Sequence, residues 1–528
     1  MTKNRVYLYD STLRDGAQTS AINFSSKDKK DIAKSIDELG IDYIEGGWPG
    51  ANPTDDSFFG DLPKLQKSQF SAFGMTKKPG NKAKEDPGLN SLIKSGTKSI
   101  CIVGKSWKFH LEHALNISEA ENYDLISDSV QYLVSQEKEV LFDAEHFFDG
   151  YKDDPKFALN CIKAAYDNGA RWVVLCDTNG GTLPSEIKDI ITQVTKHIPG
   201  ENISIHCHND TGNAVANSIA AVEAGARQIQ GTINGLGERC GNANLISLIP
   251  TLMLKMNCDV GIDKSHLKNL VKTSLFLDDI ITKEPNKFAP YVGEFAFAHK
   301  GGLHVSAIAK NTKSYEHIEP EIIGNQRKIM VSNQSGRSNI IDRLKTIGLE
   351  EKDGIKYHQI SELVNEVKDL ESQGYAYDEA DASFEILAKR KLSIIPNFFE
   401  LINFRVLNER RFNSKGSLIN ISEATVKIRI KEQEILKVGE GNGPVNALDK
   451  ALREALQKDY PALNNIRLTD YKVRILTPSQ ATQAVTRVQI ESQDDSGNKW
   501  TTIGVSENIL DASYRALHDS ITYKLMKK

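Results

Sequence analysis

Residues 172–208 contain the pattern that decides the fold: WVVLCDTNGGTLPSEIKDIITQVTKHIPGENISIHCH. The stretch opens on an apolar run (172–177), continues through a segment with apolar residues at three-to-four spacing (183–197), and closes on a second apolar run (203–208). Continuous apolar runs are typical of strands buried on both faces, whereas three-to-four spacing is typical of an amphipathic helix. The stretch therefore predicts a strand, a helix and a second, parallel strand.

The same alternation extends from the first residues to about residue 256. The predicted strands are Val6–Tyr9, Tyr43–Glu45, Phe70–Met75, Ser99–Val103, Val140–Glu145, Trp172–Asp177, Ile203–His208 and Gln228–Ile233. The predicted helices are Lys27–Leu39, Ile117–Gln136, Pro155–Asn168, Leu183–His197 and Asn213–Ala224. Gly40, Gly169 and Gly225 each follow a predicted helix, where a left-handed residue is needed. Eight βα units of this length predict a (β/α)8 TIM barrel in residues 1–270.

The rest of the chain has a different pattern. Residues 271–395 lose the βα rhythm and predict a mostly helical linker subdomain. Residues 396–528 predict a strand-strand-helix unit written twice, hence a duplicated, pseudo-symmetric α+β domain. Its predicted elements are Thr425–Ile430, Glu434–Val438, Pro444–Lys458, Lys472–Leu476, Arg487–Glu491, Trp500–Val505 and a helix from Ile509. The glycines before Pro444 indicate a tight turn at a helix start rather than a phosphate cradle.

Composition limits the classes of partner. The 528 residues carry a formal net charge of -4, which gives no basic field for a nucleic-acid backbone. The N-terminus lacks the apolar stretch of a signal peptide, and no run reaches membrane-spanning length. The six cysteines are scattered without a CxxC pair. We therefore expect a cytoplasmic protein with neither nucleic acid nor membrane as a partner.

Polar residues gather at the ends of the predicted barrel strands, where TIM barrels carry their reacting groups. They are Arg14, Asp15, Glu45, Asp143, Glu145, Asp177, Thr178, His206, His208 and the run from Asn234 to Asn242. His206 and His208 lie two apart on a strand, so both imidazoles face the same way and can bind one cation. With oxygens from Asp15 and Asn242 they suit Zn, Mn or Mg. The alternative is two hydrogen-bonded core histidines. Cys207, between them, faces the core.

Three runs in the chain resemble the signatures of a known family. DSTLRDG (10–16), HCHND (206–210) and GLGERCGNA (235–243) are similar to motifs of the metal-dependent aldol-type barrels, which include isopropylmalate, homocitrate and citramalate synthases and hydroxymethylglutaryl-CoA lyase. The duplicated C-terminal domain resembles the regulatory domain of the synthases, which lyases lack. EGGWPGANP (45–53), DAEHFFDG (143–150) and HKGGLHVSA (299–307) resemble the citramalate synthase branch. Isopropylmalate synthases usually carry a Ser-Gly-Ile-His-Gln-Asp type of sequence at 301–306.

The resemblance implies roles for individual residues. It implies that a divalent metal ion is bound by four ligands: Asp15, His206, His208 and Asn242. This ion chelates the keto acid and acts as a Lewis acid. It implies that Arg14 stabilises the developing alkoxide and that Thr178 binds the carboxylate of pyruvate. Glu145 and His304 resemble the family's proton-transfer pair. Tyr315 resembles a tyrosine that the linker supplies to the site, from the partner subunit of a homodimer.

The implied reaction joins acetyl-CoA, the co-substrate, to pyruvate and gives citramalate on the route to isoleucine, with isoleucine as an effector of the C-terminal domain. Three alternatives remain: an isopropylmalate synthase acting on 2-oxoisovalerate, a lyase, and an inactive barrel that only binds an amino acid. Taken singly, Arg14 also fits a salt-bridge partner and Asp143 and Glu145 fit a hydrated rim. The loop with Lys77, Lys78, Lys82 and Lys84 is read as solvated, with contact to CoA phosphates as the alternative.

Overall fold

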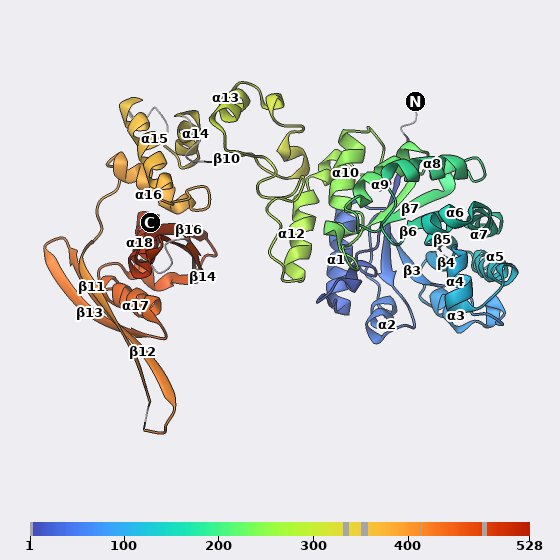
Figure 1. The fold of residues 1–528 in the computed structure, drawn as a ribbon, viewed down its shortest axis with the longest axis horizontal. Coiled ribbons are helices and arrows are strands. Elements are labelled where there is room, and N and C mark those ends of the chain that lie inside the picture. Colours follow the sequence, from blue (N-terminus) through green and yellow to red (C-terminus); the bar gives the residue numbers. More distant parts are fainter. Residues whose placement is uncertain (1–3, 331–336, 350–356, 413, 478–482, 528) are drawn as a thin grey trace. The chain divides into compact units, whose positions relative to one another are not determined.

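The computed structural model of the protein describes residues 4–330, 337–349, 357–412, 414–477 and 483–527. The chain forms two compact units (Figure 1). The first comprises Met1–Phe297 with Ile318–Gln326, and the second comprises Ala298–His317 with Arg327–Lys528. The predicted domain boundaries near residues 270 and 395 stay predictions. In the described part of the chain, no helix is long and apolar enough to cross a bilayer.

The first unit is a closed barrel of eight parallel strands in chain order, with β8 paired to β1. Its strands are β1 (Tyr7–Asp10), β2 (Tyr43–Gly47), β3 (Gln69–Met75), β4 (Ser99–Lys105), β5 (Glu139–Glu145), β6 (Trp172–Asp177), β7 (Ile203–Cys207) and β8 (Gln228–Gly231). The predicted barrel and the position of every strand are therefore confirmed. Because all strands run the same way, their carboxyl ends meet at one mouth and their amino ends at the other.

Helices surround the barrel (Figure 1). They are α1 (Ser26–Leu39), α2 (Pro53–Gly60), α3 (Pro87–Lys94), α4 (Lys108–His110), α5 (Glu119–Ser135), α6 (Phe147–Asp153), α7 (Pro155–Asp167), α8 (Pro184–Val194), α9 (Ala214–Glu223), α10 (Leu245–Leu254), α11 (Lys264–Leu267) and α12 (Leu270–Ile280). The five predicted helices correspond to α1, α5, α7, α8 and α9. Gly40 ends α1 with φ 95°, as predicted for a left-handed cap. Helices α2 and α3 were not predicted, because eight residues make too few turns for the spacing of apolar residues to be recognised.

Two apolar layers fix the strands. A smaller core fills the barrel interior with aromatic and aliphatic side chains that include Tyr9, Tyr43, Trp172 and Val174. A larger core lies between the strands and the surrounding helices, and Cys207 belongs to it. The prediction that Cys207 faces the core is confirmed. Close packing on both faces gives the strand ends the rigidity that a binding site needs.

The second unit begins with short strands and helices: β9 (Ala298–His299), α13 (Gly302–Lys310), β10 (Lys328–Ile329), α14 (Arg337–Thr346), α15 (Tyr357–Ser372) and α16 (Asp381–Lys391). Two three-stranded antiparallel sheets follow, each with a helix. The first copy is β11 (Glu400–Phe412), β12 (Leu418–Ile430), β13 (Gln433–Gly441) and α17 (Pro444–Leu456). The second is β14 (Ile466–Ile475), β15 (Thr486–Asp494), β16 (Lys499–Ser506) and α18 (Ile509–Met526).

The duplication is confirmed, and the three strands predicted for the second copy are present, but the first copy has three strands where two were predicted. The prediction lacks β11 because the polar run at 408–411 masks its alternation. Corresponding glycines let each helix approach its sheet closely. A Cβ on Gly439 would lie 2.6 Å from the amide nitrogen of Ala451, and one on Gly504 would lie 2.0 Å from the carbonyl oxygen of Ala512. These glycines therefore serve packing in both copies.

Candidate metal and catalytic site

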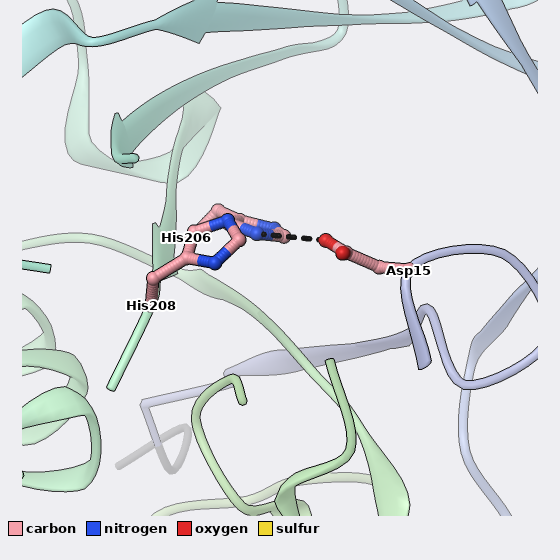
Figure 2. A group of neighbouring side chains, drawn as sticks. All are labelled: Asp15, His206 and His208. Atoms are coloured by element: carbon pink, nitrogen blue, oxygen red, sulfur yellow. Dashed lines mark ion pairs between the residues drawn. The ribbon is translucent and has the colours of Figure 1, made fainter. Parts of the chain in front are cut away.

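Asp15, His206 and His208 converge at the carboxyl-end mouth of the barrel (Figure 2). Asp15 follows β1, His206 lies in β7, and His208 comes directly after that strand. The oxygen Oδ2 of Asp15 is 3.2 Å from Nε2 of His206, and one ligand atom from each of the three residues lies within 4.8 Å of the others. All three side chains are buried. The predicted grouping of these three residues is therefore present in the structure.

Asn242 stands beside this group. It forms a β-bridge with His208, which brings the loop after β8 against the end of β7. Its Nδ2 donates a hydrogen bond to the carbonyl oxygen of Leu236 at 3.1 Å, which fixes the amide orientation. Its Oδ1 is buried and, within the described residues, accepts no hydrogen bond.

Oδ1 of Asp15 and Nδ1 of His208 are also buried and lack a hydrogen-bond partner within residues that the structure describes. A buried polar atom without a partner costs about 1–3 kcal/mol. Native structures keep few such atoms without a functional reason. Carboxylate, amide and imidazole donors are the ligands that Mg, Mn and Zn accept. These residues therefore fit a divalent cation.

The electrostatics of the group differ from one side chain to the next. Burial alone would raise the pKa of Asp15, but the Arg14 guanidinium and the two imidazoles hold that pKa well below its usual range. Burial and the neighbouring His206 lower the pKa of His208 to about 3. Burial lowers the pKa of His206 less than the hydrogen bond and charge of Asp15 raise it, so it lies above the ordinary value. Asp15 is thus anionic and His208 neutral at pH 7.

Gln230 supports the imidazole of His206 from behind. Oε1 of Gln230 is 2.9 Å from Nδ1 of His206, and Nε2 of Gln230 donates to Oδ1 of Asp143 at 3.3 Å. An amide oxygen accepts only from a protonated nitrogen, so Nδ1 carries a proton and Nε2 is left to face Asp15. Sequence reasoning missed Gln230, because a single glutamine in a strand carries no motif signal.

Arg14 is held on three sides. Its Nε donates to Oε2 of Glu45 at 2.7 Å, and its Nη1 lies 3.5 Å from Oδ2 of Asp15. The guanidinium carbon stacks 4.0 Å from the ring centroid of Phe73. The hydroxyl of Tyr9 donates to Oε1 of Glu45 at 2.8 Å. Arg14 is therefore a salt-bridge partner and, at the same time, a preorganised cation beside the ligand group.

Glu145 ends β5 and forms an ion pair with Lys105, which ends the adjacent β4. Thr178, just after β6, accepts a hydrogen bond at its Oγ1 from the amide of His146 at 2.9 Å. The hydroxyl proton of Thr178 remains available for another acceptor. The two predicted residues thus lie at the same mouth, linked through His146, which follows Glu145 in the chain and donates to Thr178. Sequence reasoning missed Lys105, because a lysine at a strand end looks like any surface charge.

His304 and Tyr315 belong to the second unit, and their approach to the barrel site stays a prediction. Their rings stack on each other with centroids 4.1 Å apart. Glu316, next to Tyr315, is buried and pairs with His299 and Arg327. This network anchors the segment that carries Tyr315.

One lysine of the loop after β3 differs from the prediction. Lys77 is not solvated as predicted: it is 7% exposed and pairs with Asp124 and Asp128 on α5. A lysine neutralised by two carboxylates is a poor contact for a phosphate group. It holds the loop on the helix instead.

Three stretches of the chain match known protein families. Residues 5–273 match the HMGL-like family. Residues 291–375 match the homocitrate synthase post-HMGL domain-like family, and residues 379–525 match the LeuA allosteric (dimerisation) domain.

Curated relatives match along nearly the whole chain. The chain is 49% identical to the (R)-citramalate synthase of Aquifex aeolicus over 525 residues, 99% of this chain and 98% of that protein. It is also 49% identical to the (R)-citramalate synthase of Geobacter sulfurreducens, with the same two shares covered. The 2-isopropylmalate synthase of Methanocaldococcus jannaschii is more distant, at 32% identity over 99% of this chain and 96% of that protein. The chain therefore belongs to the HMGL-like family and, within it, to the (R)-citramalate synthases.

Proposed function

We propose that this protein condenses acetyl-CoA with pyruvate and water to give (R)-citramalate and CoA. The observation that carries the proposal is the group of Asp15, His206, His208 and Asn242, which has buried, unpartnered donor atoms at the barrel mouth. Full-length identity of 43–49% to several (R)-citramalate synthases supports the choice of this reaction within the family.

The proposed cation site uses Asp15, His206, His208 and Asn242 as ligands, with Mn, Mg or Zn as the ion. A divalent cation bound there supplies Lewis acidity for the keto and carboxylate oxygens of pyruvate. The Nε of Arg14 already donates to Glu45, so its terminal nitrogens are the donors left for the substrate. They donate hydrogen bonds to the keto oxygen as negative charge develops there. Thr178 donates a hydrogen bond from its hydroxyl to the pyruvate carboxylate.

The proton transfers fall to Glu145, His304 and Tyr315. The acetyl methyl of a thioester is weakly acidic, so its deprotonation needs a positioned base. Glu145, fixed by Lys105, takes this proton, and the enolate attacks the keto carbon of pyruvate. His304, whose ring stacks on that of Tyr315, is the second member of the proton-transfer pair. Water then cleaves the citramalyl thioester and releases CoA.

The nearest alternative is condensation with 2-oxoisovalerate, as the name 2-isopropylmalate synthase describes for the more distant relative. One or two additional carbons in an apolar pocket shift discrimination by about 1–3 kcal/mol. The two substrates are therefore separable by rate. The chain should be stripped with a chelator, reloaded with Mn, Mg or Zn, and assayed for CoA release with pyruvate, 2-oxobutanoate and 2-oxoisovalerate.

Pyruvate is expected to give the highest kcat/KM, and the chelated protein to be inactive. The Glu145→Gln variant should bind the cation normally but release no CoA. Faster CoA release with 2-oxoisovalerate than with pyruvate would overturn the proposed substrate. Full activity without a cation would overturn the proposed role of the ligand group.

Regulation and assembly belong to the second unit. We propose that its C-terminal domain binds isoleucine as an end-product inhibitor in a cytoplasmic route to that amino acid, supported by the match to an allosteric domain.

Leu407, Leu436 and Val438 are exposed on β11 and β13, and exposed apolar side chains of this kind support a homodimer. Light scattering should give twice the chain mass, and isoleucine should inhibit CoA release more than valine or leucine does. A monomeric mass, or no response to isoleucine, would contradict these two points.

A further inference from the structure

The amino-end mouth of the barrel collects arginines from neighbouring strands. Arg5 precedes β1, Arg171 directly precedes β6, and Arg227 directly precedes β8. Asn202 directly precedes β7. Strands β6, β7, β8 and β1 are consecutive around the closed barrel. Because parallel strands begin at the same mouth, the three guanidinium groups lie along the half of the rim that these four of the eight strands form.

These residues line a cavity of about 600 Å³. The other lining residues are Asn4, Tyr7, Glu201 and Asn202. The volume lies within the range of small-molecule sites in proteins. The cavity therefore has room for a small ligand and its water.

The guanidinium groups are held in place mainly by aromatic rings and backbone oxygens. The carbon Cζ of Arg171 lies 3.9 Å from the ring centroid of Trp172, and Cζ of Arg5 lies 4.4 Å from that of Tyr7. Nη1 of Arg171 donates to the carbonyl oxygen of Glu201 at 2.7 Å. Stacked guanidinium groups lose little further freedom when they bind a ligand.

Charge is only partly balanced at this mouth. Arg5 pairs with Asp42 at 2.5 Å. Arg227 donates to the backbone oxygens of Val222 and Ala226. Within the described ranges, neither Arg171 nor Arg227 forms an ion pair with a carboxylate. Glu201 supplies the one carboxylate among the described lining residues, and it is exposed. Two guanidinium groups thus remain available to an anion.

We propose that the arginine-lined cavity at the amino-end mouth is a second binding site of this protein, which takes a small oxyanion with two or more negative charges. Planar guanidinium groups donate paired hydrogen bonds to phosphate or carboxylate oxygens, which matches this ligand class. Asn202 adds a neutral polar group to the wall. The site lies at the mouth opposite Asp15 and His206, so the inference does not rest on the proposed reaction.

Inorganic phosphate is the probe for this site. Calorimetric titration of the full chain with phosphate, and with acetate as a monovalent control at matched ionic strength, should give saturable binding for phosphate only. Arg227→Gln should weaken phosphate binding about ten-fold, because it removes one charge-assisted contact. Glu201→Gln should tighten phosphate binding, because it removes the carboxylate from the wall. Arg467→Gln, an exposed change in the second unit, is the matched control and should bind as the parent does.

Three results would overturn the proposal: no saturable phosphate binding, equal binding of acetate, or unchanged affinity in Arg227→Gln. The last result would place the phosphate elsewhere, for example at the carboxyl-end mouth. Arg171→Gln is a weaker test because Arg171 also stacks on Trp172 and its loss disturbs folding. Among the described residues, the Arg227 side chain donates hydrogen bonds to the backbone oxygens of Val222 and Ala226 and stacks on no aromatic ring, so its variant decides the question. If the parent chain binds phosphate but releases no CoA from acetyl-CoA and pyruvate, that result counts against the proposed reaction and not against this site.

Discussion

Oε1 of Gln230 lies 2.9 Å from Nδ1 of His206, on the side of the imidazole opposite the one that faces Asp15. This contact fixes both the tautomer and the rotation of the ring. Gln230 therefore determines how His206 presents Nε2, the atom that the proposed cation would bind.

Replacing Gln230 by leucine is expected to weaken binding of Mn or Zn about 10–100-fold, the usual effect of losing such a supporting contact. Gln228 is the matched control: it lies two residues earlier in β8, is equally buried, and its amide has no partner within the described residues. Gln228→Leu should leave cation affinity unchanged and should not lower stability, because it removes unsatisfied buried atoms. Calorimetry of both variants checks this, and equal losses in both would contradict it.

Cation binding should depend on pH through His206. Asp15 raises the pKa of this imidazole above its ordinary value, and the cation can bind only after the ring loses its proton. Apparent affinity is therefore expected to rise by up to about ten-fold per pH unit below that pKa and to level off above it. His208, with its pKa lowered to about 3, adds no dependence near neutrality. Titrations at pH 6.0 to 8.5 in buffers of different ionisation enthalpy measure the released proton. An affinity that is flat over this range would contradict the assignment.

Asp10 should make the barrel less stable as pH rises. Burial raises the pKa of Asp10 to about 7, although Thr12 donates two hydrogen bonds that favour the carboxylate. Between about pH 4 and pH 7 the folded chain therefore holds a proton that the unfolded chain has lost. Stability falls as pH rises through this window, by roughly 4 kcal/mol in total.

The Asp10→Asn variant removes this titration. Its thermal unfolding transition should vary less between pH 5 and pH 8 than that of the parent chain, when both are measured without a cation. Parallel pH profiles for the two proteins would show that Asp10 does not titrate in this range.

Lys105→Met should lower kcat about ten-fold without changing cation affinity, because Glu145 loses the ion pair that fixes its carboxylate. Lys152→Met is the matched control, since Lys152 forms an ion pair with Glu186 between two outer helices. The control should keep the parent rate. Steady-state CoA release measures both. Equal rates for Lys105→Met and the parent would show that this ion pair has no part in positioning the base.

The barrel could be predicted because each of its strands and long helices is recognisable from its own short stretch of sequence. Each buried strand is a short apolar run, and each long helix shows its own period, so the sequence alone indicates eight βα units. The ligand group was predictable for a related reason. His206 and His208 alternate with Cys207 along one strand, and strand order then brings Asp15 to the same mouth.

What could not be predicted depends on pairing between distant segments. Gln230 meets His206 only because β7 and β8 are neighbours in a particular register. Lys105 meets Glu145 because β4 pairs with β5. Strand β11 escaped detection because its second half is exposed and polar, so the alternation that marks a half-buried strand is lost there.

The separation of Glu145 from His304 and Tyr315 into two independently packed units has an evolutionary consequence. Substitutions that repack the second unit leave the packing around Asp15, His206 and His208 unchanged, because the barrel has an apolar core of its own. A lineage can therefore vary the sheets of the distal unit, which lie far along the chain from His304 and Tyr315, without altering the strand ends of the barrel.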